Sequence, residues 1–496
     1  MKNIRILTYY TLFFIGLVLI VFFIVHNRLD PDFGWHLRTG QLILERGVPH
    51  QDWYTYTMPD FPWIDHEWLT DVLMYVAYAH LGIYTLSFIF ILLYIVSFFV
   101  IKKPGQNFWS FFIVVILGSM ATIDFLGLRP QLLSVLFTAI LLKVVSKFLD
   151  NSSKLIYCLP PLFVLWANMH AGFFAGLFIL AILIALEIGK KFNLQEIKNL
   201  RFLRIFHFKT QPSKKILILG IIFILSFLVT MINPYGIRIY EEIFRTVGDG
   251  FLKFHIAEWL PLPFSGFKPF IYLYIGFFIA LLLKFYRKME FNEVVLSCIF
   301  LLFSLSSIRY FLIFVIVTTP ILTQFVYQLK DQINIKQTYK TLMVVDKVSL
   351  MLMFVVVMGL LSYYGFYEFS SAVLSKEFYP VKAIPFVKTL PLSENMFNDY
   401  GWGGYMIWKL PERKVFIDGR MPSWRQNGQF VFGDYFNIMQ TQKGFEKILN
   451  TYDVQLVLIR KSIKDDAEAQ GKLPKNTKLK QFFEEHHWLN VISFQM

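Results

Sequence analysis

The chain has 496 residues, of which 56% are hydrophobic and only 17% are charged. Soluble globular proteins carry about 25% charged residues, so this composition excludes an ordinary soluble protein and is typical of a polytopic membrane protein. The net charge of +14 could indicate nucleic-acid binding, but most of the excess lies in short loops between hydrophobic runs, where it sets membrane topology. We therefore expect no nucleic-acid partner. The two cysteines, Cys158 and Cys298, lie in separate apolar runs, which disfavours a disulfide framework or a thiolate metal site.

Hydrophobic runs recur along the first three quarters of the chain. A helix that crosses a bilayer needs roughly 20 apolar residues, and this criterion predicts about eleven transmembrane spans. The predicted spans lie at about 5–26, 84–101, 108–123, 130–148, 154–168, 171–188, 216–233, 269–286, 291–307, 310–328 and 348–366. The first run is longer than a signal-peptide core and no small-residue cleavage site follows it, so we expect it to remain as the first span. The stretch 68–80 is apolar but short and contains Asp71, so we expect it to lie in the membrane interface.

The distribution of lysine and arginine orients these spans. With the eleven-span arrangement, most basic residues of the short loops fall on one side, and the positive-inside rule makes that side cytoplasmic. The N-terminus is then cytoplasmic and the C-terminal segment extracytoplasmic. If the stretch 68–80 crossed the membrane, the count would be twelve and the later loops would exchange sides, which the charge distribution disfavours.

The character of the chain changes after about residue 367, where hydrophobic runs shorten and charges return. Short apolar stretches predict strands at 395–397, 414–417 and 454–459, and helical patterns cover 444–449 and 479–486. About 130 residues are enough for a small α/β domain. We therefore expect a transmembrane domain over 1–366, which includes a long first outer loop at 27–83, and an extracytoplasmic α/β domain over 367–496.

The first outer loop carries two motifs in which acids, histidines and tryptophans are combined, DPDFGWH (30–36) and WIDHEW (63–68). Their candidate functional residues are Asp30, Asp32, His36, Asp65, His66 and Glu67. Charged groups beside a membrane are costly unless they are paired or hydrated. One of these carboxylates is suited to act as a general base toward an acceptor hydroxyl or amine, and a pair is suited to hold a divalent cation with phosphate oxygens. The structural alternative is that they cap interfacial helices and pair with Arg28 and Arg38.

Further polar residues lie at the outer ends of the predicted spans. The candidates for binding a carrier phosphate or a sugar are Arg129, Asn168, His170, Asn233, Tyr235 and Arg309. Several have a structural alternative: the Arg129 guanidinium would close its turn by pairing with Asp124, Arg309 would snorkel to the interface, and Asn168 and His170 would form a tight turn.

Two glycine-containing motifs stand out in the C-terminal segment, YGWGGY (400–405) and FIDGRMP (416–422). Glycines suit a tight turn where the backbone approaches a ligand or another strand. We expect Asp418 and Arg420 to end a strand, a common place for binding groups in α/β folds, and we include Trp402 as a candidate. A wholly structural role is the alternative. The sequence contains no P-loop, GxSxG, HExxH or kinase motif set, so these chemistries lose support.

A long first outer loop with an early acid, then many spans and an outer C-terminal domain, resembles the GT-C superfamily of integral-membrane glycosyltransferases. Members include protein O-mannosyltransferases, aminoarabinose transferases and oligosaccharyltransferases. The similarity lies in the layout and in the DPDFGWH loop. The motifs DPDFGWHLRTG, PWIDHEWL, LRPQ, WANMHAGF, NPYG, YGWGGY and FIDGR also resemble those of a group of largely uncharacterised bacterial multi-pass membrane proteins, which implies the bacterial inner membrane.

Membership of the GT-C superfamily would imply transfer of a sugar from a polyprenyl-phosphate carrier to a lipid, glycan or protein acceptor on the extracytoplasmic side. The early loop acid would be the base, which points to Asp32 with Asp30 as its rival. The residues of the second loop motif would assist or bind Mg²⁺ or Mn²⁺ together with Asp32, although several such enzymes work without a metal. Arg129 and Arg309 would face the carrier phosphate, whose developing charge they would stabilise. The DHE triplet (65–67) has no close match in the well-known families, which leaves the metal and the donor open.

Two other functions remain as alternatives. A non-enzymatic protein that binds, flips or polymerises envelope glycolipids would use the arginines but would not need Asp32. An ion-coupled transporter should carry ionisable residues near the middle of its spans, whereas here they collect at the outer ends.

Overall fold

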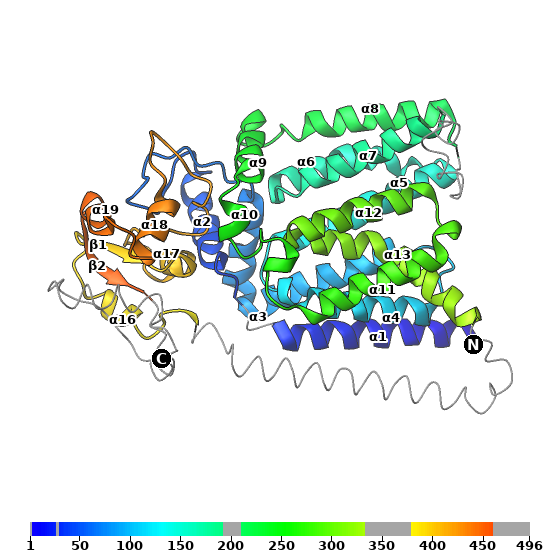
Figure 1. Cartoon of the computed structure of the whole chain (residues 1–496), viewed down its shortest axis with the longest axis horizontal. Coiled ribbons are helices and arrows are strands. Elements are labelled where there is room, and N and C mark those ends of the chain that lie inside the picture. The colour runs from blue at the N-terminus through cyan, green and yellow to red at the C-terminus, as the bar shows by residue number, and fades with distance from the viewer. Residues whose placement is uncertain (1, 26–28, 192–209, 333–377, 460–496) are drawn as a thin grey trace. The chain divides into compact units, whose positions relative to one another are not determined.

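A computed structural model of the chain describes residues 2–25, 29–191, 210–332 and 378–459 (Figure 1). The chain forms two compact units, each assembled from separate stretches of sequence. The helical unit, as we call it, comprises residues 1–26, 87–237 and 250–367. The mixed unit comprises residues 27–86, 238–249 and 368–496. The first outer loop therefore belongs to the same unit as the C-terminal segment, whereas the sequence assigned it to the transmembrane domain.

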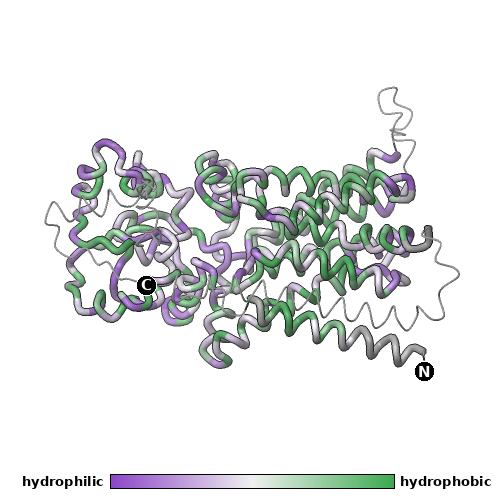
Figure 2. The backbone as a smooth tube through the Cα atoms, turned by 60° about the horizontal axis from the view of Figure 1, so that its bottom comes forward, coloured by the Kyte–Doolittle hydropathy of each residue, from purple (hydrophilic) through white to green (hydrophobic). Residues whose placement is uncertain are grey.

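The helical unit is built from apolar helices that run alongside one another (Figure 1). Its main elements are α1 (Lys2–Val25), the later part of α3 (Trp68–Ile101), α4 (Phe108–Thr122), α5 (Gln131–Asn151), α6 (Leu159–Met169), α7 (Phe173–Lys191), α8 (Ser213–Val229), α10 (Leu252–His255), α11 (Pro269–Phe285), α12 (Phe291–Ser306) and α13 (Phe311–Gln332). A helix lies within or across each predicted span up to residue 328, although α6 begins five residues after and α8 ends four residues before the predicted bounds. The last predicted span, 348–366, lies outside the described residues. Figure 2 shows that these helices are hydrophobic over most of their length.

Within the described ranges, five helices are long and apolar enough to cross a membrane, which gives the chain the character of a helical membrane protein. They are Trp68–Ile101, Phe108–Phe125, Gln131–Asn151, Phe173–Lys191 and Ile308–Leu329. Helix α3 is interrupted at Gly82, where φ is 76° and ψ is 171°. This break falls between the interfacial stretch 68–80 and the span 84–101 that the sequence predicts. A left-handed φ of this kind is readily adopted by glycine, which has no Cβ.

Lipid is as apolar as the helices themselves, so burial of apolar surface alone does not hold membrane helices together. Close approach between helices stabilises the helical unit instead. Gly118 on α4 faces α13, and a Cβ at this position would come within 2.9 Å of the Val315 side chain. The Tyr274 hydroxyl on α11 lies 2.9 Å from the Thr318 hydroxyl on α13. Small residues and interhelical hydrogen bonds are the usual means by which membrane helices pack.

The mixed unit combines short helices with a two-stranded parallel sheet. Its elements are α2 (Phe33–Arg46), the start of α3, α9 (Ile239–Gly248), α16 (Ile384–Val387), β1 (Asn395–Asn398), α17 (Gly403–Lys409), α18 (Val431–Met439), α19 (Phe445–Thr451) and β2 (Val454–Leu458). Strand β1 pairs with β2 in parallel, with Met396 opposite Leu456 and Asn398 opposite Leu458. The strands predicted at 395–397 and 454–459 and the helix predicted at 444–449 are confirmed, and the helix predicted at 479–486 lies outside the described residues.

The strand predicted at 414–417 is wrong. This segment forms a single parallel bridge, between Val415 and Thr55, and does not join β1 and β2. The buried Asn398 side chain accepts the N–H of Phe416 at 2.8 Å, and its amide donates to the Ile417 oxygen at 2.8 Å. An asparagine side chain thus satisfies the backbone groups that a neighbouring strand would otherwise have paired. Asp418 and Arg420 consequently follow an extended segment and not a sheet strand.

Candidate functional site

The mixed unit contains a buried cluster of acids around His36, which we call the acid–imidazole cluster. Its buried members are His36 in the first turn of α2, Asp65 and Glu67 in the loop before α3, and Asp71 in the first turn of α3. Its half-buried member is Asp32, the N-cap of α2. Local hydrogen bonds set the path of the loop into the helix. The Asp65 carboxylate accepts the N–H of Glu67 at 3.1 Å, and the Glu67 carbonyl oxygen accepts the N–H of Asp71 at 2.9 Å. The second loop motif therefore leads directly into α3.

His36 is the centre of this cluster. Its Nδ1 lies 2.6 Å from Oδ1 of Asp71, its Nε2 lies 3.5 Å from Oε2 of Glu67, and it is only 3% exposed. The Trp35 ring covers the imidazole, with 3.7 Å between ring centroids. Gly40 lets α2 approach the start of α3, because a Cβ there would lie 2.0 Å from the Asp71 carbonyl oxygen. The sequence predicted a catalytic His36, and the structure places its imidazole in a buried position between the carboxyls of Asp71 and Glu67.

Burial dominates the protonation of the acids in this cluster. It raises the pKa of Glu67 to about 8; the His36 imidazole opposes this shift and the neighbouring carboxylates reinforce it. Burial also raises the pKa of Asp65 well above its usual range, again reinforced by Asp71. The Oδ2 atoms of Asp65 and Asp71 are buried and have no hydrogen-bond partner within the described part of the chain. The cluster therefore holds protons at neutral pH instead of carrying a full set of negative charges.

Asp30, Asp32 and His66 form the more accessible edge of this region, because all three are half-buried. Asp30 Oδ1 accepts the N–H of Asp32 at 2.9 Å, and Asp32 Oδ1 accepts the indole N–H of Trp35 at 3.0 Å. His66 Nε2 lies 3.8 Å from Oε1 of Glu67. Asp32 thus combines partial exposure with a fixed orientation beside the buried acids, which a general base requires.

The C-terminal motif FIDGR contacts the first loop motif directly. A Cβ at Gly419 would lie 1.7 Å from Oδ1 of Asp32, so only glycine fits between Asp418 and Arg420 in this arrangement. Similarly, a Cβ at Gly34 would lie 2.1 Å from the carbonyl oxygen of Gly404, where α2 packs on α17. The glycines of both motifs therefore permit close backbone packing, as their type predicted.

Arg420 is enclosed by aromatic rings and carboxylates. Its guanidinium donates to Oδ1 and Oδ2 of Asp418 at 2.8 and 2.6 Å and to Oδ1 of Asp52 at 2.8 Å. The Trp63 and Tyr54 rings lie 4.3 and 4.8 Å from the guanidinium carbon. Burial alone would lower the pKa of Arg420, but Asp418 and Asp52 outweigh it and raise the pKa. Arg420 therefore joins the C-terminal segment to the loop 52–63 and stays charged inside the unit.

Trp402 has a structural role in this unit. It is 5% exposed, and its indole N–H donates to the carbonyl oxygen of Phe378 at 2.5 Å. Asp418 is fully buried in its pair with Arg420. Of the three candidates in the C-terminal segment, none presents a free polar group at the surface, which agrees with the structural alternative.

The two predicted phosphate-binding arginines lie together in the helical unit, on either side of Glu258. Arg129 forms an ion pair with the Glu258 carboxylate, while Arg309 donates its backbone N–H to the Glu258 carbonyl oxygen at 3.1 Å and lies over the Trp259 ring at 4.2 Å. Burial would raise the pKa of Glu258, but the two guanidiniums outweigh it and lower the pKa. Asp124, the alternative partner of Arg129 in the sequence analysis, pairs with Lys268 at 3.0 Å.

The remaining candidates of the helical unit support tight turns. Ser134 lies 2.7 Å from Nδ1 of His170, and that Nδ1 also lies 2.8 Å from the N–H of Gly172. The Asn168 side chain donates to the carbonyl oxygen of Ile232 at 2.8 Å. Asn233 Oδ1 accepts the N–H of Tyr235 at 2.8 Å, and its amide donates to the Thr230 oxygen at 2.7 Å. These contacts place Asn168, His170, Asn233 and Tyr235 in the hydrogen bonding of the turns.

Metal binding finds no support in the arrangement of these side chains. Within the described ranges, no group of three or more His, Cys, Asp or Glu residues is placed to hold a metal ion. Asp32, Asp65 and Glu67, the predicted ligands for Mg²⁺ or Mn²⁺, thus do not form such a group.

Sequence reasoning missed several residues that complete these sites. Asp71 pairs with His36 and Asp52 pairs with Arg420, and Glu258 lies between the two arginines. A signal for Asp71 was present, since an acid in the first turn of an apolar helix needs a partner. No known protein-family model and no curated protein sequence matches the chain, so the residues described above are the basis for any statement about its function.

Proposed function

We propose that the chain is a membrane glycosyltransferase of the GT-C type, which moves a sugar from a polyprenyl-phosphate-linked donor to an extracytoplasmic lipid, glycan or protein acceptor. The observation that carries this proposal is the half-buried Asp32 carboxylate, held by Trp35 at the edge of the acid–imidazole cluster. Asp32 would accept the proton of the acceptor hydroxyl or amine. Asp30, which orients the Asp32 backbone, is the rival for this role.

The buried acids would favour this chemistry by keeping their protons. Because the pKa of Glu67 is about 8, Glu67 is mostly neutral at pH 7 and adds little repulsion to the charge on a nearby carboxylate. His36 would hold the side chains of Glu67 and Asp71 in place. The surroundings of Asp32 would thus be rigid. A base on this rigid support would retain its position while the acceptor binds.

The arginines of the helical unit would bind the carrier. The leaving group in this reaction is a polyprenyl phosphate, whose negative charge grows as the glycosidic bond breaks. Arg129 forms an ion pair with the Glu258 carboxylate, and Arg309 lies close enough to lower the pKa of the same carboxyl. The two guanidiniums together would supply the positive charge for a phosphate. Arginine is suited to phosphate because its planar guanidinium donates in two directions at once.

The location follows from the distribution of charge along the chain. We infer a bacterial inner-membrane protein with about eleven spans, a cytoplasmic N-terminus and an extracytoplasmic mixed unit. The excess of Lys and Arg in alternate loops supports this orientation. Donor and acceptor would then be extracytoplasmic, on the same side as Asp32.

A second candidate function is non-enzymatic binding, flipping or assembly of envelope glycolipids. The observation that favours it is the depth of the acid–imidazole cluster, since His36, Asp65 and Asp71 are at most 3% exposed. Buried acids that are fully enclosed can serve stability alone. In this case Asp32 would have no proton to accept.

Replacement of Asp32 by Asn separates these functions. Membranes containing the full chain would be incubated with radiolabelled polyprenyl-phosphate hexoses and pentoses, and the released polyprenyl phosphate and the bound donor would both be measured. An enzyme should lose turnover by about 100-fold or more while donor binding is retained. The control is Asp60→Asn, an exposed acid in the same loop. Equal turnover in the two variants would exclude Asp32 as the base.

A further inference from the structure

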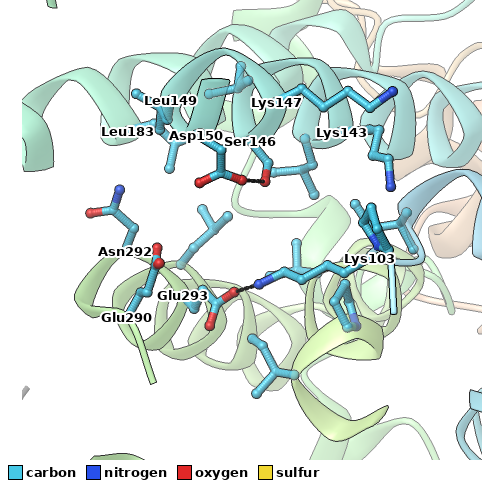
Figure 3. A pocket seen from close by; sticks show the side chains of 18 of the residues that line it. Lys103, Lys143, Ser146, Lys147, Leu149, Asp150, Leu183, Glu290, Asn292 and Glu293 are labelled. Carbon is cyan, nitrogen blue, oxygen red and sulfur yellow. Dashed lines mark hydrogen bonds and ion pairs between the residues drawn. The ribbon is translucent and has the colours of Figure 1, made fainter. Parts of the chain in front are cut away.

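A cavity of about 430 Å³ lies within the helical unit (Figure 3). It is bounded by the end of α3, the last turns of α5, the start of α12 and the middle of α13. Most of its wall is aliphatic and includes Leu183, Leu296 and Val317. Pockets that bind small ligands have volumes of roughly 300–1,000 Å³, so this cavity is large enough for one.

The backbone of α13 explains why this space exists. Pro320 lies inside the helix and lines the cavity, and its ring removes an N–H from the helical hydrogen-bond ladder. The Gln106 side chain donates to the carbonyl oxygen of Pro320 at 2.6 Å and thus fixes the loop between α3 and α4 against α13. Pro320 and the Gln106 contact therefore lie together at this side of the cavity.

Cationic groups line one side of the cavity. Figure 3 shows the ammonium groups of Lys143 and Lys147 on the same side, both from α5. Lys143 donates to the backbone carbonyl oxygen of Lys102, and Lys147 forms no ion pair within the described ranges. Lys103 is different, because Glu293 neutralises it. Two lysines thus remain without a carboxylate partner.

Acceptor groups line the other side. Glu290 and Asn292, at the start of α12, lie across the cavity from the two lysines (Figure 3). Asn292 is 8% exposed, and its amide donates to Oε1 of the buried Glu187 at 2.6 Å. Its Oδ1 atom is buried and lacks a hydrogen-bond partner among the described residues. A buried acceptor without a donor costs about 1–3 kcal/mol, so a hydrogen-bond donor that reached this atom would be stabilising.

The charges of the cavity balance but are separated. Its lining includes the cations Lys103, Lys143 and Lys147 and the anions Asp150, Glu290 and Glu293, so +3 and −3 cancel. A polyanion such as a nucleotide would find no net positive charge here. A molecule with one negative and one positive group and an apolar chain matches the separated charges and the aliphatic wall together.

We propose that this cavity binds an amino-phospholipid, with its phosphate against Lys143 and Lys147, its primary ammonium against Asn292 and Glu290, and an acyl chain along the aliphatic wall. The surrounding helices α5, α7 and α13 coincide with candidate membrane spans, so lipid is the neighbour of this part of the chain. The site lies in the helical unit and includes none of the residues of the acid–imidazole cluster or the arginine pair.

Thermal unfolding of the purified full chain in detergent tests this proposal, since a ligand that binds the folded state raises the midpoint by an amount that grows with the ratio of ligand concentration to Kd. The probes are short-chain phosphatidylethanolamine, short-chain phosphatidylglycerol, phosphoethanolamine and inorganic phosphate. We expect saturable stabilisation by phosphatidylethanolamine, with about tenfold weaker apparent affinity for phosphatidylglycerol and weaker still for the two chain-free probes.

The variants assign the effect to this cavity. Lys147→Gln should weaken binding of both lipids, and Glu290→Gln should abolish the preference for phosphatidylethanolamine over phosphatidylglycerol. The matched control Lys154→Gln, an exposed lysine just after α5, should bind both lipids as the unmodified chain does. Equal affinity for the two lipids in the unmodified chain, or phosphoethanolamine binding as tightly as the lipid, would overturn the proposal. Unchanged binding in both cavity variants would overturn it as well.

Discussion

The imidazole of His36 and the carboxylate of Asp71 are 2.6 Å apart, and neither side chain is more than 4% exposed. This contact joins the first turn of α2 to the first turn of α3, two helices that begin 35 residues apart. A hydrogen bond of this kind is strong when it is made and costly when one partner is removed, because the remaining carboxylate stays buried.

Replacement of His36 by leucine should therefore destabilise the mixed unit. The variant leaves Asp71 without its donor, and we expect the free energy of unfolding to fall by about 3 kcal/mol. The measurement is the thermal unfolding midpoint of the purified chain in detergent. His80→Leu, which replaces an exposed histidine on α3, is the control and should change the midpoint little. If both variants melt alike, the contact between His36 and Asp71 contributes no stability.

The stability of the mixed unit should fall as the pH rises from about 5 to 8. The pKa of Glu67 is about 8 in the folded chain and 4.5 in its reference state, so within this window the folded chain holds a proton that the unfolded chain has lost. Folding then takes up protons, and Glu67 alone lowers the unfolding free energy by at most about 1.4 kcal/mol for each pH unit. Above pH 8 the Glu67 contribution should level off.

Glu67→Gln tests the origin of this slope. The amide cannot titrate, so the dependence of the unfolding midpoint on pH should become shallower than in the unmodified chain. The pKa of Asp65 is also raised, so the Glu67→Gln variant should retain part of the pH dependence. Glu45→Gln, on the exposed side of α2, should retain the full dependence. An unchanged slope in Glu67→Gln would show that other groups control it.

Arg420→Lys should destabilise the chain far more than Arg425→Lys. A lysine cannot donate to Asp418 and Asp52 with the planar geometry of a guanidinium, and it leaves two buried carboxylates partly unpaired. We expect a loss of about 3 kcal/mol at Arg420. The Arg425 side chain is 43% exposed in its pair with Asp249, so its replacement should cost at most about 1 kcal/mol. Unfolding in urea provides the comparison, and similar losses would contradict the role of the enclosed guanidinium.

Gly34→Ala should be destabilising although alanine is the better helix former. The new Cβ would lie 2.1 Å from the Gly404 carbonyl oxygen, which forces α2 away from α17 at a cost of about 1–3 kcal/mol. Gly248→Ala is the control, because a Cβ there would meet nothing within 4 Å. Thermal unfolding of both variants decides the point. A stabilised Gly34→Ala would mean that the two helices are not in close contact.

The positions of most of the described helices could be predicted from the sequence. Apolar composition over a run of residues is a local property, and a bilayer selects for it directly. The break at Gly82 lies between the predicted interfacial stretch 68–80 and the predicted span 84–101. Here too the signal is local, because Asp71 and Gly82 interrupt the apolar run. The strand predicted at 414–417 failed because its pairing depends on a distant side chain, Asn398, that replaces a strand partner.

The sequence by itself determined that this is a helical membrane protein and that its first loop and its C-terminal glycine motifs hold the notable polar residues. Only the tertiary structure decided that these motifs belong to one unit, that His36 is enclosed by Asp71 and Glu67, and that Arg420 pairs with Asp52 across 368 positions. The reason is physical: hydrophobicity acts through composition along the chain, whereas a buried charge is stabilised by whichever residue the fold places within hydrogen-bond distance.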